Sequence, residues 1–184
     1  MIYTFFAIDI IGTSIALFIT IIIAIKIISE FTTDAPFLEV PDHVLPYMIN
    51  AMKLNDSSVL YDLGSGNGKV LISAVETNPN INAVGVEVGL IPYYISKFQT
   101  RNYKQIKIVR DDFFDSRLEN VTHIFLFLSP IVNDLYKLIK HHAEPGTKIV
   151  SCDFEIREVS PNEIIEMQLP SGVKRGKKLF VYTV

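Results

Sequence analysis

Short apolar runs alternate with helical patterns through most of this chain, and this alternation constrains the fold more than any other feature. Strand-like runs are predicted at residues 58–63, 82–87, 106–110, 123–128 and 147–153. Helical patterns are predicted between them, at about 68–78, 90–103 and 131–143. Strands that alternate with helices form parallel sheets, because each helix carries the chain back across the sheet. The sequence therefore predicts an α/β, Rossmann-like, doubly wound fold.

The C-terminal part of the chain has a different pattern. Two further strand-like runs, at residues 163–169 and 179–184, are separated by "PSGVKRGKK", which leaves no room for a helix. Two strands joined this way pair as an antiparallel hairpin. We therefore expect a mostly parallel seven-stranded sheet in which a C-terminal antiparallel hairpin closes one edge.

The first 28 residues hold 21 apolar side chains, and no charged residue occurs from Ile10 to Ile25. A helix over residues 5–28 would be about 36 Å long, enough for a hydrocarbon core of about 30 Å. We therefore predict one N-terminal transmembrane helix, with an anchor and linker over residues 1–33 and a domain over residues 34–184. A cleaved signal peptide and a buried core helix are the alternatives. A signal peptide begins with basic residues, and none occurs here before Lys26. A core helix is less expected because this segment is apolar on all faces.

Lys26 is the only basic residue near either end of the apolar segment. Basic residues flank membrane helices mainly on the cytoplasmic side. The expected location is a single-pass membrane protein whose domain lies in the cytoplasm.

The charge and the cysteine content exclude several classes of protein. The chain has 17 basic and 20 acidic residues, a net charge of −3, which excludes a strongly basic nucleic-acid binder. A single cysteine, Cys152, excludes a disulfide framework and a cysteine-based zinc site. The histidines have no metal-ligand spacing, so no metal is expected.

A turn with three glycines, at positions 64, 66 and 68, follows the strand that contains Asp62. Such a turn at a strand end, opening a helix, is where open α/β sheets bind nucleotides. Its spacing differs from the dinucleotide and Walker patterns. A carboxylate two residues before the first glycine is unfavourable beside a pyrophosphate but favourable beside an ammonium group.

Carboxylates stand at the ends of three successive strands: Asp62, Glu87 and Asp112. S-adenosyl-L-methionine has two cationic groups and a ribose diol but no phosphate, so it matches this acidic set. Glu87 is expected to accept the ribose hydroxyls, and Asp112 the adenine amino group, with Phe113 beside the ring. Taken singly, these features are also compatible with a structural turn, a solvated glutamate and an acidic loop.

These motifs resemble those of class I, seven-strand S-adenosylmethionine-dependent methyltransferases, over residues 36–184. "LYDLGSGNGKVLI" is similar to their first motif, "GVEVG" to the second and "RDDFFD" to the third. The resemblance implies S-adenosyl-L-methionine as cofactor and S-adenosylhomocysteine as product. It implies that Asp62, Gly64, Ser65 and Gly66 bind the methionine end.

Within that class the chain most resembles the small archaeal and the membrane-anchored mitochondrial-type protein-lysine methyltransferases. The segment "PFLEVP" shares Pro36, Phe37 and Pro41 with their pre-domain motif and differs at Glu39 and Val40. The resemblance implies that Phe37 contacts the cofactor.

The acceptor site is less marked in the sequence. "FLFLSP" after the fourth strand lacks the Asn/Asp-Pro-Pro-aromatic motif of enzymes that methylate amide or base nitrogens. Ser129 and Pro130, and Asp153 after the fifth strand, are the candidates for this site, and no general base is assigned.

The expected function is a membrane-anchored methyltransferase that acts on a lysine of a membrane or membrane-associated protein, with its bilayer contact through residues 5–28 and no nucleic acid partner. One alternative is a small-molecule or lipid methyltransferase at the membrane surface. The other is a non-catalytic scaffold that binds S-adenosylmethionine.

Overall fold

The computed structural model describes residues 2–31, 39–128 and 131–184, and within the first helix the side chains of residues 10–25 and 27. The chain divides into two compact units, Met1–Pro36 and Phe37–Val184. The sequence had placed this boundary between residues 33 and 34. The two units are described separately below.

The N-terminal unit is a single helix, α1 (Ile2–Phe31). Its side chains are exposed where they are described, as Leu17 and Phe18 are at 62% and 64%. The expectation of a helix over residues 5–28 is confirmed. In the described part of the chain, however, no helix has both the length and the apolar character needed to cross a membrane, so the transmembrane assignment is not confirmed.

Seven strands form one sheet in the described residues of the second unit, in the order β3-β2-β1-β4-β5-β7-β6. Five of them are parallel: β1 (Val59–Leu63), β2 (Asn82–Val86), β3 (Ile106–Val109), β4 (His123–Leu126) and β5 (Lys148–Cys152). Each lies within one or two residues of its predicted run. β1, β2, β4 and β5 are largely buried, and β4 is buried at every position, as expected for a sheet covered on both faces. The edge strand β3 is only partly buried.

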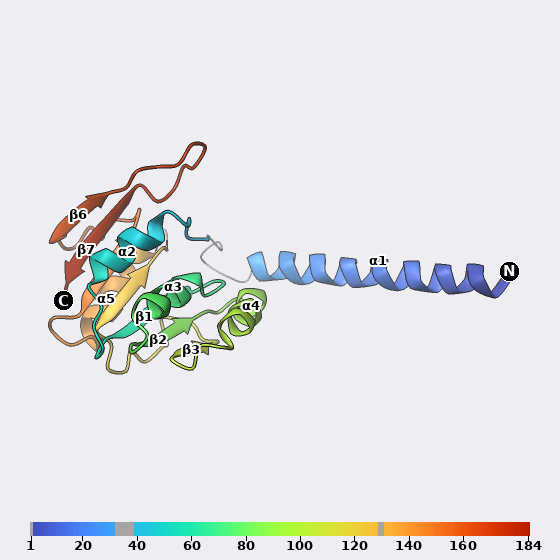
Figure 1. Cartoon of the computed structure of the whole chain (residues 1–184), viewed down its shortest axis with the longest axis horizontal. Coiled ribbons are helices and arrows are strands. Elements are labelled where there is room, and N and C mark those ends of the chain that lie inside the picture. The colour runs from blue at the N-terminus through green and yellow to red at the C-terminus, as the bar shows by residue number, and fades with distance from the viewer. Residues whose placement is uncertain (1, 32–38, 129–130) are drawn as a thin grey trace. The chain divides into compact units, whose positions relative to one another are not determined.

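The strand order reverses beside β1, and this reversal makes the fold doubly wound. From β1 the chain moves outward to β2 and β3, and then returns to place β4 on the other side of β1 (Figure 1). Right-handed crossovers in opposite directions put their helices on opposite faces of the sheet. The carboxyl end of β1 therefore lies at the topological switch point, where such sheets bind ligands.

Helices cover the sheet, and α2, α3 and α5 do so with their apolar faces. α2 (Val44–Met52) and α3 (Lys69–Thr77) pack against each other and the sheet. α4 (Leu90–Thr100) packs against β3, and α5 (Val132–His142) connects β4 to β5. α3 buries Val70, Leu71, Ala74 and Val75, and α5 buries Val132, Leu135, Tyr136 and Ile139. These spacings of three and four residues confirm the helical pattern seen in the sequence.

The last two strands form the predicted antiparallel hairpin. β6 (Glu163–Glu166) pairs with β7 (Lys178–Thr183), and β7 pairs antiparallel with β5. Leu179 to Tyr182 of β7 are buried, whereas β6 is mostly exposed. The hairpin thus closes one edge of the sheet, with its inner strand contributing to the core.

Candidate active site

The turn after β1 is built on glycines in left-handed backbone conformations. Gly64, Gly66 and Gly68 have φ angles of 80°, 55° and 82°, a region that residues with a Cβ rarely adopt. The backbone N–H groups of Gly64 and Ser65 both donate to Val86 O of β2, at 2.9 and 3.0 Å. The turn is therefore fixed to the neighbouring strand before Gly68 caps the start of α3.

Gly68 has no room for a side chain. A Cβ at this position would lie 2.6 Å from Oγ of Ser96, a fully buried residue of α4. Glycine here allows α4 to approach the start of α3 closely. The turn is thus held from both sides, by β2 and by α4.

Glu87 follows β2 and reaches the glycine turn with its side chain. Its Oε2 accepts the backbone N–H of Gly66 at 2.9 Å, and its Oε1 accepts that of Gly89 at 2.7 Å. The side chain is buried, and burial raises its pKa, an effect opposed by these two hydrogen bonds. The predicted ribose-binding carboxylate is therefore oriented before any ligand arrives, and its remaining lone pairs can accept hydroxyl groups.

Asp62 is the second buried carboxyl group of the site, at 4% exposure. Burial, and then the charge of Glu87, raise its pKa to about 8. No described residue donates a hydrogen bond to its carboxyl group. An unpaired buried acid lowers its free energy when a cation binds beside it, so this position favours a positively charged ligand.

A pocket opens between the turn, the start of α3 and the segment before α2. It brings together four of the predicted cofactor residues, Asp62, Gly64, Ser65 and Gly66, and is otherwise lined by Glu39, Val40, Asn67, Lys69, Val70 and Phe127. The Oγ of Ser65 is buried and has no hydrogen-bond partner in the described residues. An unsatisfied hydroxyl in a pocket is typical of a group that a ligand satisfies.

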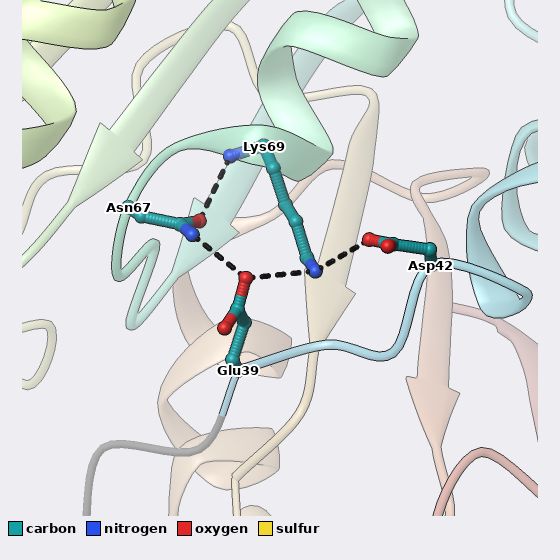
Figure 2. A network of polar contacts seen from close by, with 4 residues as sticks. All are labelled: Glu39, Asp42, Asn67 and Lys69. Atoms are coloured by element: carbon teal, nitrogen blue, oxygen red, sulfur yellow. Dashed lines mark hydrogen bonds and ion pairs between the residues drawn. The ribbon is translucent and has the colours of Figure 1, made fainter. Parts of the chain in front are cut away.

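The segment before α2 is bound to the glycine turn by a charged network (Figure 2). Lys69 Nζ lies 2.9 Å from Glu39 Oε1 and 2.8 Å from Asp42 Oδ1. Asn67 donates to Glu39 Oε1 at 3.0 Å and accepts the backbone N–H of Lys69 at 3.2 Å. The hydrogen bonds from Lys69 lower the pKa of both carboxyl groups. The network therefore holds residues 39–42 against the pocket and keeps the carboxyl groups of Glu39 and Asp42 ionised.

The predicted adenine residues lie outside this pocket. Asp112 is exposed, and its Oδ1 accepts the backbone N–H of Phe114 at 2.9 Å. Phe113 is buried at 7% exposure and lies against Phe114, with ring centroids 5.0 Å apart. Both residues follow β3, which pairs in parallel with β2, the strand that leads to Glu87. They therefore lie at the same edge of the sheet as Glu87. Their contact with adenine stays a prediction.

Asp153 has a structural position that the sequence did not indicate. Its carboxylate accepts backbone N–H groups of the β6–β7 loop, from Gly176 and Lys177 at 2.6 Å each and from Lys178 at 3.2 Å. These three bonds attach the loop to the end of β5. Asp153 therefore holds the hairpin against the end of β5, and it does not line the described pocket. Phe37, Ser129 and Pro130 lie outside the described residues.

The sequence analysis missed several lining residues, notably Asn67, Lys69 and Phe127. Asn67 and Lys69 stand inside the glycine motif, and this position could have indicated that they lie at the site. Their partners, Glu39 and Asp42, lie about thirty residues earlier in the chain, so nothing in the sequence indicated the contacts. Glu39 was noted only as a departure from a motif. The charged network it forms explains why an acidic residue is favourable there.

The residues described in this structure show no group of three or more His, Cys, Asp or Glu side chains that could hold a metal ion. Cys152 is fully buried, and burial raises the pKa of its thiol well above the usual range. It therefore acts as a small core side chain.

The pocket and the adjoining Glu87 carry groups that match S-adenosyl-L-methionine. In the pocket, Asp62 offers an unpaired carboxyl group to a cation and Ser65 an unsatisfied hydroxyl. Glu87 does not line the pocket, but it accepts the N–H of Gly66, which does, and it offers an oriented carboxylate to a diol. A Cβ at Gly64 would lie 2.8 Å from Leu128 Cδ2, so glycine here lets Leu128 pack closely on the turn. No lysine or arginine other than Lys69 lines the pocket in the described residues, and Lys69 is already paired with two carboxylates. The site is therefore unsuited to a phosphate ligand.

Comparison with known proteins agrees with this fit. An RNA methyltransferase from Salinibacter ruber, solved with S-adenosyl-L-homocysteine, superposes with a TM-score of 0.72 at 25% identity, covering 79% of this chain and 93% of that one. A methyltransferase from Geobacter sulfurreducens, also with S-adenosyl-L-homocysteine, has a TM-score of 0.57 at 15% identity, covering 80% and 58%. A protein-lysine N-methyltransferase of Saccharolobus islandicus (strain REY15A) is 29% identical over 143 residues, covering 76% of this chain and 89% of the relative.

The fold and the site define a class I S-adenosylmethionine-dependent methyltransferase. Residues 62–163, more than half of the chain, match the profile of the ANTKMT methyltransferase domain. The chain belongs to that family.

Proposed function

We propose that this protein transfers a methyl group from S-adenosyl-L-methionine to the ε-amino group of a lysine in a protein. The observation that carries the proposal is the relative named a protein-lysine N-methyltransferase, whose similarity spans 89% of its own length.

S-adenosyl-L-methionine supplies an activated methyl group on a sulfonium sulfur. The carbon–sulfur bond breaks as the carbon–nitrogen bond forms, and the proton of the amine passes to water. The protein has to hold a neutral amine in line with the methyl group and exclude water. No step requires a metal ion or an external oxidant.

Phe127 places an apolar ring at the pocket. It lines the pocket at 6% exposure, and its ring lies 5.8 Å from that of Phe154, which follows β5. An apolar ring at this position helps to exclude water from the reacting amine, as the displacement requires. Ser129 and Pro130, next along the chain from this ring, remain our candidates for the acceptor side of the site.

The test is methyl transfer with the full-length protein. The protein is incubated with isotopically labelled S-adenosyl-L-methionine and extracts containing proteins, lipids and RNA, and the labelled site is mapped by mass spectrometry. Glu87→Ala serves as the variant with weakened cofactor binding, at a cofactor concentration that leaves its site largely empty. Label on a lysine, absent with Glu87→Ala, is the expected result.

Other outcomes identify other functions. Label in the lipid or small-molecule fraction would replace the lysine proposal with a lipid or small-molecule methyltransferase. Label in the RNA fraction would indicate an activity like that named for the Salinibacter ruber protein. Cofactor binding with no transfer to any fraction would favour the non-catalytic scaffold.

We also propose that the apolar N-terminal segment attaches the domain to a membrane, with the domain on the cytoplasmic side. The support comes from the sequence, which carries no charge from Ile10 to Ile25 and has Lys26 on the side of the domain. The test is fractionation of cells that produce the full chain or a chain without residues 1–36. Equal amounts of both proteins in the soluble fraction would exclude this attachment.

A further inference from the structure

α4 buries polar side chains and exposes apolar ones. Its buried residues are Ser96 and Thr100, at 0% and 4% exposure. Tyr94, Ile95 and Phe98 are 62%, 43% and 66% exposed. A surface helix ordinarily turns its apolar side toward the core, so the orientation of α4 is the reverse of the usual one.

The exposed apolar residues form a stripe directed away from the domain. Leu90, Tyr94 and Phe98 are spaced by four residues and therefore lie along one side of the helix. Since successive residues are about 100° apart, this side is roughly opposite to Ser96 and Thr100. α4 lies at the β3 edge of the domain (Figure 1), and no described element covers the stripe.

Cationic side chains border the stripe. Arg101 stacks on Phe98, with its guanidinium carbon 3.9 Å from the ring centroid, and donates to Phe98 O at 2.6 Å. Lys97 Nζ lies 5.5 Å from the centroid of the Tyr93 ring. Their positive charges therefore stand directly beside apolar surface.

The sequence around α4 contains basic residues and no acidic ones. No aspartate or glutamate occurs from residue 88 to residue 110, in a chain whose net charge is −3. Five basic residues in this stretch are exposed, and none forms an ion pair with a described residue: Lys97, Arg101, Lys104, Lys107 and Arg110. Unpaired cations over so long a stretch favour an anionic partner.

We propose that α4 is a docking surface for an anionic lipid bilayer. The α4 patch consists of the apolar residues Leu90, Tyr94, Ile95 and Phe98 with the cations Lys97 and Arg101. Interfacial helices combine an apolar side that enters the bilayer with lysine and arginine side chains that meet anionic headgroups. A symmetric contact between two copies would bring the cations of both chains together, which is unfavourable.

Docking through α4 orients the catalytic site. Gly89, the residue before α4, donates its N–H to Glu87 Oε1 at 2.7 Å. The patch is therefore joined directly to the ribose end of the cofactor site. A bilayer bound there lies beside that site, and this role depends neither on α1 nor on the identity of the methyl acceptor.

The chain contains no tryptophan, so one introduced tryptophan reports on its own position. Phe98→Trp is compared, in the full-length protein, with Ile164→Trp, because Ile164 of β6 is also exposed, at 50%. Both are mixed with vesicles of phosphatidylcholine alone or with about 30% phosphatidylserine. Emission wavelength and quenching by brominated lipid are measured.

We expect the tryptophan at 98 to shift to shorter wavelength and to be quenched in anionic vesicles, and the tryptophan at 164 to stay unchanged. Adding Lys97→Gln and Arg101→Gln should lower the affinity for anionic vesicles about thirtyfold, and high salt should act likewise. Both variants carry the same N-terminal segment, so any attachment of the protein to vesicles through that segment is the same for both tryptophans.

Three results would overturn the proposal. The first is equal quenching of both probes, and the second is quenching at 98 that does not depend on phosphatidylserine. The third is a blue shift at 98 that occurs without lipid, or only with vesicles carrying membrane proteins, since the α4 patch would then bind a protein.

Discussion

The backbone N–H of Gly66 donates a 2.9 Å hydrogen bond to Oε2 of Glu87, which joins the turn after β1 to the end of β2. Glu87 thus fixes the glycine turn before any ligand binds. The same carboxylate is the one expected to accept the ribose hydroxyls. Formation of the turn and recognition of the cofactor therefore depend on one side chain.

Glu87→Ala should weaken binding of S-adenosylhomocysteine about a hundredfold. The change removes the charged acceptor expected to bind the two ribose hydroxyls, and it leaves the N–H groups of Gly66 and Gly89 without their acceptor. Glu87→Gln should lose less, since one amide oxygen remains. Titration calorimetry measures both affinities. Glu166→Ala, at an exposed glutamate paired with Lys178, is the control and should bind normally. Normal binding by Glu87→Ala would remove Glu87 from the site.

Cofactor binding should release a proton near neutral pH. The pKa of the Asp62 carboxyl is about 8 in the folded protein because of burial and the charge of Glu87. A cation bound beside Asp62 favours its ionised form, so binding displaces the proton. Calorimetry in buffers of different ionisation enthalpy measures this release. Asp62→Asn should show none, whereas an equal release in that variant would contradict the assignment.

The same carboxyl should make stability depend on pH. Its pKa is raised on folding, so the folded protein keeps a proton that the unfolded chain loses between about pH 4 and 8. The free energy of unfolding of the cofactor-free protein should fall as pH rises through this window, by up to about 1.4 kcal/mol per unit from this group. Denaturant unfolding measures it, and Asp62→Asn should flatten the profile.

Lys69→Met should loosen the segment over the cofactor pocket. It removes both ion pairs that hold Glu39 and Asp42. We expect S-adenosylhomocysteine to dissociate faster, while the stability changes by only about 1 kcal/mol, since the two acids are exposed. Stopped-flow release measures the rate. Lys137→Met is the matched control, because Lys137 also pairs with two carboxylates, Asp134 and Glu158, on the surface. Equal effects of the two variants would contradict a specific role.

Asp153→Ala should destabilise the protein by about 2–3 kcal/mol, because three backbone N–H groups of the hairpin loop lose their acceptor. Cofactor affinity of the folded protein should stay unchanged. Chemical denaturation and calorimetry test the two parts, with Asp56→Ala in an exposed turn as control. If Asp153→Ala left the stability unchanged and raised the KM for the acceptor substrate, Asp153 would belong to the acceptor site.

Local sequence patterns predicted most of the fold correctly. The apolar runs identified the five parallel strands and the helices between them, because burial on both faces of a parallel sheet requires nearly continuous apolar runs. The last two strands were identified by the short connection between them, which leaves no room for a helix. The glycines at 64, 66 and 68 marked the turn, because only glycine readily adopts positive φ at three alternating positions. These signals lie within a few residues of one another, so the sequence displays them directly.

The structure brings part of the predicted site together. Asp62, Gly64, Ser65 and Gly66 line one pocket, and Glu87 is bonded to the turn. Asp153 was assigned by its place at a strand end, but its side chain direction depends on its backbone φ of 61° and on a loop more than twenty residues later. No local pattern records such a contact.

The sequence by itself determined the class of this protein, since the alternation of strands and helices, the glycine turn and the carboxylates at strand ends are all local features. The tertiary structure decided which of the acidic residues serve the pocket and which hold loops in place. It also decided which side of α4 is exposed, because the burial of Ser96 and Thr100 results from packing against β3 and the glycine turn. Side-chain partners distant in sequence are set by the folded arrangement, where burial and hydrogen bonding select among the positions that the chain allows.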